Sequence, residues 1–194
     1  MKKLFLLLLL AHSLLLGACA TVPRDAEEIQ AQSQLIDRRT RTVIAADKAI
    51  ETEAYSELNS DSELRDQCHI TIHAYNAAVL VAGEVPNEEL SKKIITVVQG
   101  IANVKLVHNN LNIAYPTDAA TRNNDAVIND TVKKALGQIR TMPDFSSSMV
   151  KVITENGVVY LMGQVHRDEG TVVINVTRLQ PGIKEIITVF EYLD

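Results

Sequence analysis

The stretch "ENGVVYLMGQVHRDEGTVVI", residues 155–174, decides the fold, because the chain contains it twice in altered form. Residues 75–94 read "YNAAVLVAGEVPNEELSKKI", and the two stretches align at an offset of 80. Among the aligned positions that keep the same residue are Asn76 and Asn156, Val79 and Val159, Gly83 and Gly163, Val85 and Val165, and Glu89 and Glu169. Self-similarity at a fixed offset is typical of a chain built from repeated structural units.

The repeat continues towards the C-terminus. Residues 101–111, "IANVKLVHNNL", match residues 183–193, "IKEIITVFEYL", once two residues are inserted in the second copy. We therefore expect two copies of one small domain, over residues 43–115 and 121–194.

Each copy is expected to contain helix, strand, strand, helix and strand, in that order. Apolar residues at helical spacing predict the helices, and alternation such as that in "HITIHAY" predicts the strands. In the first copy the predicted helices cover about residues 43–59 and 88–99, and the predicted strands cover residues 69–75, 78–85 and 103–113. In the second copy the predicted helices cover about residues 125–141 and 169–179, and the predicted strands cover about residues 149–155, 158–165 and 183–192.

The N-terminal stretch "LFLLLLLAHSLLLGACA", residues 4–20, has the layout of a signal peptide. Two lysines precede its apolar run over residues 4–16, which is too short to span a bilayer, since a transmembrane helix needs roughly 20 apolar residues. Its end, "LGAC", resembles the lipobox of bacterial lipoproteins, which implies removal of residues 1–18 and acylation of Cys19. The alternative is an ordinary signal peptide with a cysteine near its cleavage site. Ala20 resembles the residue that directs such lipoproteins to the outer membrane.

Residues 19–42 are expected to form a lipidated N-terminus and a flexible tether, because they are polar and contain few large apolar side chains. The basic run at residues 37–41 is interpreted as a solvated linker end or as a contact to lipid headgroups. Loss of two lysines with the signal peptide makes the formal charge of −5 more negative, so binding to nucleic acid is not expected. With Cys19 acylated, Cys68 has no disulfide partner and is expected to be a packed residue rather than a reactive thiol.

Residues 150–190, "VKVITENGVVYLMGQVHRDEGTVVINVTRLQPGIKEIITVF", resemble a BON domain, a module named for bacterial osmotic-stress and nodulation proteins. The resemblance rests on a strand, an Asn-Gly turn of the kind that tight hairpins prefer, a Val/Leu strand ending in Gly-x-Val, a helix and a Pro-Gly-Ile strand. The first copy has Ala77 in place of the turn glycine, so its hairpin is expected to be less regular. The expected fold class is α+β, with two tandem αββαβ BON domains, each a three-stranded mixed sheet with two helices on one face.

With the lipobox included, nearly the whole chain is similar to outer-membrane lipoproteins with two BON domains, of the DolP type. The resemblance implies a lipid-anchored protein on the periplasmic face of the outer membrane, which supports membrane integrity and is enriched at division sites. It also implies two partners, anionic phospholipid bound through the second BON domain and the β-barrel assembly machinery. The chain is therefore interpreted as a lipid-binding envelope module, with a protein-interaction adaptor for such machinery as the alternative. Its oligomeric state stays open.

Charge favours the second copy as the one that contacts lipid. Residues 43–63 carry a net charge of −5, whereas the equivalent residues 121–141 carry +2. Each basic residue near an anionic membrane contributes on the order of 1 kcal/mol, so the sign of the charge decides between the two copies.

Within the helix of the second copy, Val127 lies off the apolar stripe that would face the core, and Thr131 and Lys134 share its face. The predicted lipid-binding residues are Val127, Thr131, Lys133 and Lys134. In the alternative interpretation, Val127 covers an edge of the fold and the lysines are solvated. The family favours a larger aromatic residue near the start of this helix, and the chain contains no tryptophan, which weakens the expected membrane insertion.

No catalytic site, metal or cofactor is expected, and the protein is not expected to be an enzyme. His69 and His73 share a strand face, but four residues of strand separate them by about 13 Å, too far to share a zinc ion whose ligands lie about 2 Å away. Residues 162–170, "MGQVHRDEG", contain a histidine and acids without a paired nucleophile, and acids are typical of a helix start.

Overall fold

The computed structural model describes residues 37–194, in which the chain forms the same arrangement of helices and strands twice. The first repeat consists of α2 (Arg41–Ser60), α3 (Ser62–Gln67), β1 (His69–Tyr75), β2 (Ala78–Val85), α4 (Glu88–Gly100) and β3 (Leu106–Ile113). The second consists of α5 (Ala119–Leu136), the short 3-10 helix η1 (Ser147–Met149), β4 (Val150–Glu155), β5 (Val158–Val165), α6 (Arg167–Arg178) and β6 (Glu185–Tyr192). The predicted signal peptide over residues 1–18, the predicted lipidation site Cys19 and most of the predicted tether lie outside the described residues.

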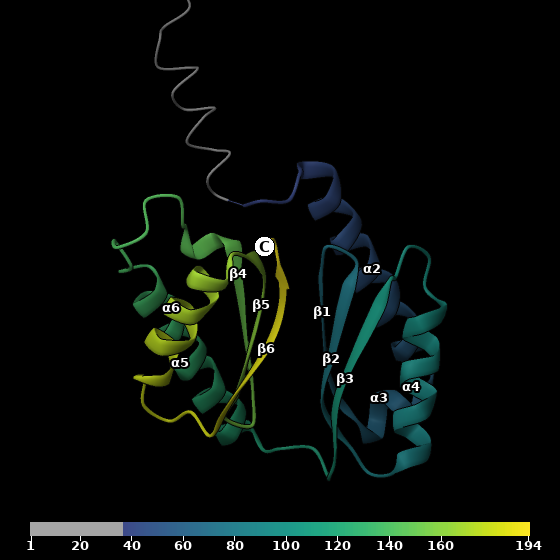
Figure 1. The fold of residues 1–194 in the computed structure, drawn as a ribbon. Coiled ribbons are helices and arrows are strands. Elements are labelled where there is room, and N and C mark those ends of the chain that lie inside the picture. The colour runs from purple at the N-terminus through teal and green to yellow at the C-terminus, as the bar shows by residue number, and fades with distance from the viewer. Residues whose placement is uncertain (1–36) are drawn as a thin grey trace, which may run out of the picture. The chain divides into compact units, whose positions relative to one another are not determined.

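Each repeat contains a three-stranded mixed sheet. In the first sheet β2 lies between β1 and β3, antiparallel to β1 and parallel to β3. The second sheet repeats this pattern with β5 between β4 and β6. Helices α2 and α4 pack on one face of the first sheet, and α5 and α6 on one face of the second (Figure 1). The expected α+β fold of two tandem αββαβ units is therefore confirmed.

Local capping explains where the helices begin and end. Asn87 caps α4 by accepting a hydrogen bond of 2.9 Å from a first-turn amide, as its position before the predicted helix suggested. Helix α5 begins earlier than the predicted residue 125 because Asp118 caps it, and it ends sooner than predicted, just before Gly137. Asp61 interrupts the first helix in an extended conformation and caps the short helix α3, which the sequence pattern did not predict.

The β-hairpins of the two repeats have the same turn geometry. The φ angles of the turn residues are 49° at Asn76, 66° at Ala77, 49° at Asn156 and 78° at Gly157. The prediction of a less regular first hairpin is therefore wrong. Asp47 on α2 holds that turn, because its carboxylate accepts hydrogen bonds of 2.8 Å from the amides of both Asn76 and Ala77. Asp125 on α5 accepts from both turn amides of the second repeat in the same way.

Three hydrophobic clusters hold the described residues together. One lies between the first sheet and its helices, and another between the second sheet and its helices. The third joins the two sheet faces that the helices leave uncovered, and its buried members are Tyr75, Leu80, Ala82, Ile153, Tyr160 and Met162. The sheets thus pack face to face, and β2 and β5 are buried on both sides. Burial on both sides explains why the sequences of β2 and β5 are apolar nearly throughout.

Residues 37–40, which precede α2 in the chain, contact both repeats through their side chains. The Arg38 guanidinium donates two hydrogen bonds of 2.6 Å to Glu169 in the second repeat, and Arg39 pairs with Asp47 in the first at 2.8 Å. Burial is the largest influence on Glu169 and disfavours its charge, but the hydrogen bonds from Arg38 and the His166 amide, together with the charge of Arg38, outweigh burial and lower the pKa of Glu169. The side chains of Arg38 and Arg39 are only 17% and 11% exposed. This end of the segment predicted as a tether over residues 19–42 is therefore folded against both domains.

Residues 37–194 lie within one compact unit, which contains all three hydrophobic clusters. Cys68 is half-buried against the first cluster, as expected of a packed residue, and burial raises the pKa of its thiol. Within residues 37–194, none of the helices combines the length and the apolar composition needed to cross a bilayer.

Candidate functional site

Helix α5 of the second repeat carries all four residues predicted to bind lipid. Its inner face is formed by Ile128, Val132 and Leu136, which are buried in the second hydrophobic cluster. Asp125 is also buried, and its carboxylate is bound by the amides of the hairpin turn, so its negative charge does not face solvent. The residues between these positions form the surface of the helix.

Three of the predicted residues, Val127, Thr131 and Lys134, share one side of α5, which we call the outward face. Val127 is 63% exposed, and its carbonyl oxygen accepts a hydrogen bond of 2.8 Å from the Thr131 hydroxyl. The Lys134 ammonium lies 3.5 Å from the carboxylate of Asp130, and both side chains are more than two-thirds exposed. An ion pair this exposed contributes little, so Lys134 remains available to another anion.

Lys133 lies on a different flank of α5. It lines a cavity of about 480 Å³ together with residues of both repeats, among them Arg39, Tyr75 and Lys151. Six residues along a helix correspond to a rotation that leaves Lys133 about 120° away from Val127. The structure therefore groups Val127, Thr131 and Lys134 but separates Lys133 from them.

Burial also changes the charge comparison between the repeats. On α5 the exposed charged residues comprise three basic side chains and one acidic side chain, namely Arg122, Lys133, Lys134 and Asp130. On α2, Asp47 and Glu51 are buried and paired, which leaves two basic and two acidic exposed residues, namely Arg41, Lys48, Glu53 and Glu57. The second repeat still presents the more positive helix, but the contrast is smaller than a count along the sequence suggests.

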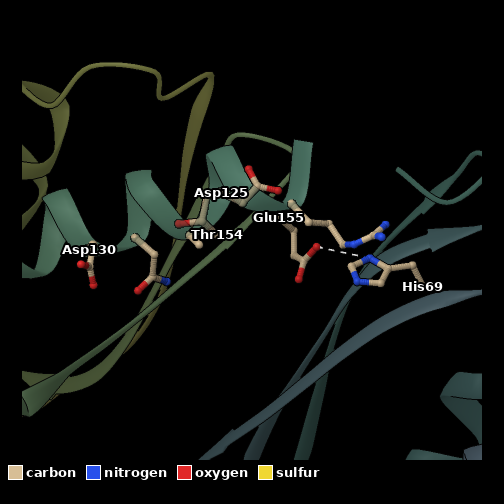
Figure 2. Close-up of a pocket in the computed structure, with 8 residues that line it drawn as sticks. His69, Asp125, Asp130, Thr154 and Glu155 are labelled. Atoms are coloured by element: carbon tan, nitrogen blue, oxygen red, sulfur yellow. Dashed lines mark ion pairs between the residues drawn. The ribbon is translucent and has the colours of Figure 1, made fainter. Parts of the chain in front are cut away.

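A second feature, which the sequence did not reveal, is a cavity of about 360 Å³ beside the N-terminal half of α5 (Figure 2). Figure 2 shows the carboxylate of Glu155, at the end of β4, pointing towards the imidazole of His69 on β1, with Asp125 and Asp130 on the neighbouring helix. His69 Nδ1 lies 3.6 Å from Glu155 Oε2 and 3.2 Å from Oε2 of Glu84, which is only 2% exposed.

The His69, Glu84 and Glu155 side chains are the group within the described residues whose donor atoms could hold a metal ion. Burial is the largest influence on Glu155 and raises its pKa, although the Thr71 hydroxyl and His69 act in the opposite direction. The sequence pattern missed this cluster because its two glutamates belong to different repeats. The single signal was a glutamate inside the otherwise apolar strand "AVLVAGEV".

Comparison with known proteins identifies the family. The model of the BON domain matches residues 46–115 and 124–194. Over its full length the chain is 26% identical to the outer membrane lipoprotein DolP of Haemophilus influenzae, 97% of which is covered. It is 25% identical to the 21 kDa hemolysin of Actinobacillus pleuropneumoniae, with 81% of this chain and 80% of that protein covered.

Among solved structures, the C-terminal domain of CdsD, the structural protein of the type III secretion system of Chlamydia trachomatis, aligns with 76% of this chain and 67% of its own. The identity is 16% and the TM-score is 0.30.

The similarity to DolP includes both repeats and the N-terminal residues that precede them. The two segments that match the family model correspond to the two repeats seen in the structure and together make up well over half of the chain. The chain therefore belongs to the BON domain family and contains two BON domains in tandem.

Proposed function

We propose that this protein is a lipoprotein of the outer membrane, anchored on the periplasmic face by acyl chains on Cys19, whose second BON domain contacts anionic phospholipid through the outward face of α5. The observation that carries the proposal is the exposed Val127 beside Thr131 and Lys134, on the more positive of two equivalent helices. The cellular role that we assign to it is support of outer-membrane integrity, with enrichment at division sites.

The attraction between α5 and a membrane is weak by itself. Two net positive charges near an anionic surface contribute about 2 kcal/mol, and burial of one valine side chain adds about 1.5 kcal/mol. The total of about 3.5 kcal/mol corresponds to a dissociation constant of several millimolar. An acyl anchor holds the domain at an effective concentration in the millimolar range or higher, which makes such a contact useful. The α5 contact would then select the lipid and orient the domain, while Cys19 provides attachment.

Vesicle co-sedimentation tests the lipid contact with the compact fragment 34–194, which lacks the anchor. The fragment should sediment with phosphatidylglycerol or cardiolipin vesicles at millimolar lipid and stay in solution with phosphatidylcholine vesicles. Lys134→Glu removes about 2 kcal/mol of attraction and should lower the partition coefficient roughly 10- to 30-fold. Lys133→Glu should lower it less, because Lys133 lies on the other flank of the helix.

Lys92→Glu is the matched control for this experiment, since Lys92 is an exposed helical lysine of the first repeat and the substitution changes the net charge equally. It should retain the binding of the unmodified fragment. Unchanged co-sedimentation of Lys134→Glu, or an equal loss in Lys92→Glu, would show that α5 is not the contact.

A photo-crosslinking residue in place of Val127 tests the proposal in the full-length chain in its membrane. Lipid contact predicts phospholipid adducts at this position. Reproducible protein adducts instead would favour the second candidate function, a protein-interaction adaptor for envelope machinery such as the β-barrel assembly complex, with membrane contact only through the acyl anchor.

A further inference from the structure

One imidazole and two carboxylates come together where the first BON domain meets the second. His69 and Glu84 are cross-strand partners on β1 and β2, so their side chains lie next to each other. Glu155 is the last residue of β4 in the second domain. The donor atoms of all three side chains lie within 4.8 Å of one another.

The charge of this cluster is incompletely balanced. Within residues 37–194, the ion pairs of Glu84 and of Glu155 both involve His69 alone. One imidazole N–H cannot serve two carboxylates fully, and a buried charge without a partner is costly. Arg122 lines the adjacent cavity, but its guanidinium donates to the carbonyl oxygen of Thr117. A positively charged ligand would therefore complete the cluster.

We infer that His69, Glu84 and Glu155 form a binding site for one divalent cation of the zinc class, shared between the two BON domains. A nitrogen donor beside carboxylate oxygens suits zinc and related transition metals, whereas magnesium and calcium prefer oxygen donors alone. Tetrahedral zinc, about 2.0–2.2 Å from each ligand, places neighbouring donor atoms about 3.4 Å apart.

The observed spacings are close to this value. His69 Nδ1 lies 3.2 Å from Glu84 Oε2 and 3.6 Å from Glu155 Oε2. The widest spacing among the three donor atoms, at most 4.8 Å, would close with side-chain shifts of about 1 Å. The imidazole would bind through Nδ1 and carry its proton on Nε2.

Surrounding groups hold both carboxylates from outside the cluster. The amide and the hydroxyl of Thr117 each donate to Glu84 Oε2 at 3.3 Å, and the Thr71 hydroxyl donates to Glu155. Such contacts orient carboxylate ligands and are typical of metal sites. They leave His69 and the cavity side of the cluster free to take part in binding.

The cavity of about 360 Å³ gives access to the cluster, because His69 and Glu155 both line it (Figure 2). A water molecule there can supply the fourth ligand that three-residue zinc sites usually leave open.

Zinc binding is tested with the full-length chain, purified in a zwitterionic detergent and freed of metal with a chelator. Isothermal titration with zinc chloride should show one saturable site per chain. Zinc at about one hundred times its dissociation constant should raise the melting temperature by about 5–10 °C, because the ion binds only the folded chain. Magnesium chloride at the same concentration should leave the melting temperature unchanged.

Variants locate the site. His69→Gln and Glu155→Gln should each lower zinc affinity at least tenfold, whereas the matched control His73→Gln, on the same strand about 13 Å away, should retain it. Cobalt(II) bound to the unmodified chain should give the visible absorption of a tetrahedral site, and zinc should displace it, which keeps the test decisive if a variant does not fold. No saturable zinc binding, or binding that neither ligand variant weakens, would overturn the proposal.

Discussion

At the scale of single residues, the repeat is maintained where the backbone leaves little choice of side chain. Gly83 has a φ of 116°, and a Cβ atom there would overlap the carbonyl oxygen of His69 on the neighbouring strand. Gly163 meets the carbonyl oxygen of Met149 in the same way. These close approaches explain why both copies keep a glycine at this point of the second strand.

Ala77 departs from this rule, because an alanine occupies a position with a φ of 66°. The left-handed conformation costs alanine about 1–2 kcal/mol. Replacement by glycine recovers only part of this cost, because glycine has more conformational freedom to lose when the chain folds. Ala77→Gly is therefore expected to raise the free energy of unfolding by about 0.5–1 kcal/mol, measured by urea denaturation of fragment 34–194. Ala78→Gly, one residue further in β2, should lower it. A loss of stability in both variants would contradict strain at Ala77.

At the scale of elements, Glu51 ties helix α2 to both sheets. Its carboxylate accepts hydrogen bonds of 3.0 Å from the Ala74 amide on β1 and 2.6 Å from Lys151 on β4. Burial disfavours its charge, but His73, Lys151 and the Ala74 amide together outweigh burial and hold the pKa of Glu51 well below its usual range. Because the pKa is lowered on folding, Glu51 contributes stability above about pH 4.3, and this contribution is lost as the pH falls.

Glu51→Gln is expected to lower the free energy of unfolding by about 1–3 kcal/mol at pH 7, because it leaves Lys151 without its charged partner. The difference from the unmodified chain should shrink below about pH 4, which urea denaturation from pH 7 to pH 3 would measure. Glu53→Gln, at an exposed position of the same helix, should change stability by no more than about 0.5 kcal/mol. A difference that does not depend on pH would mean that the charge of Glu51 is not what matters.

The elements themselves were largely predictable from local pattern, and their ends less so. The predicted strands over residues 69–75, 78–85 and 158–165 have the bounds of β1, β2 and β5, because alternation and turn residues mark both ends. The ends of α5 were missed because they depend on Asp118 and Gly137, which lie outside the apolar periodicity. The regular first hairpin was missed because Asp47, which holds the turn, is distant in sequence.

At the scale of the whole molecule, contacts between the repeats could not be predicted from either copy alone. Leu80 and Tyr160 pack between the two sheets, on the strand faces that do not contact the helices. The one signal of this packing in the sequence was that β2 and β5 are apolar on both faces. The same long-range contacts bury Glu51 and pair it with Lys151 of the other repeat. A charge count along the sequence therefore located the more positive helix but overestimated how much it differs from its counterpart.

Lipid contact through the outward face of α5 is tested most directly by mapping amide shifts of fragment 34–194 by NMR during titration with phosphatidylglycerol-containing micelles. The largest shifts are expected at Val127, Thr131 and Lys134, smaller ones at Lys133, and none on α2. Largest shifts on α2, or along the exposed strands β3 and β6, would contradict the assignment of lipid binding to α5.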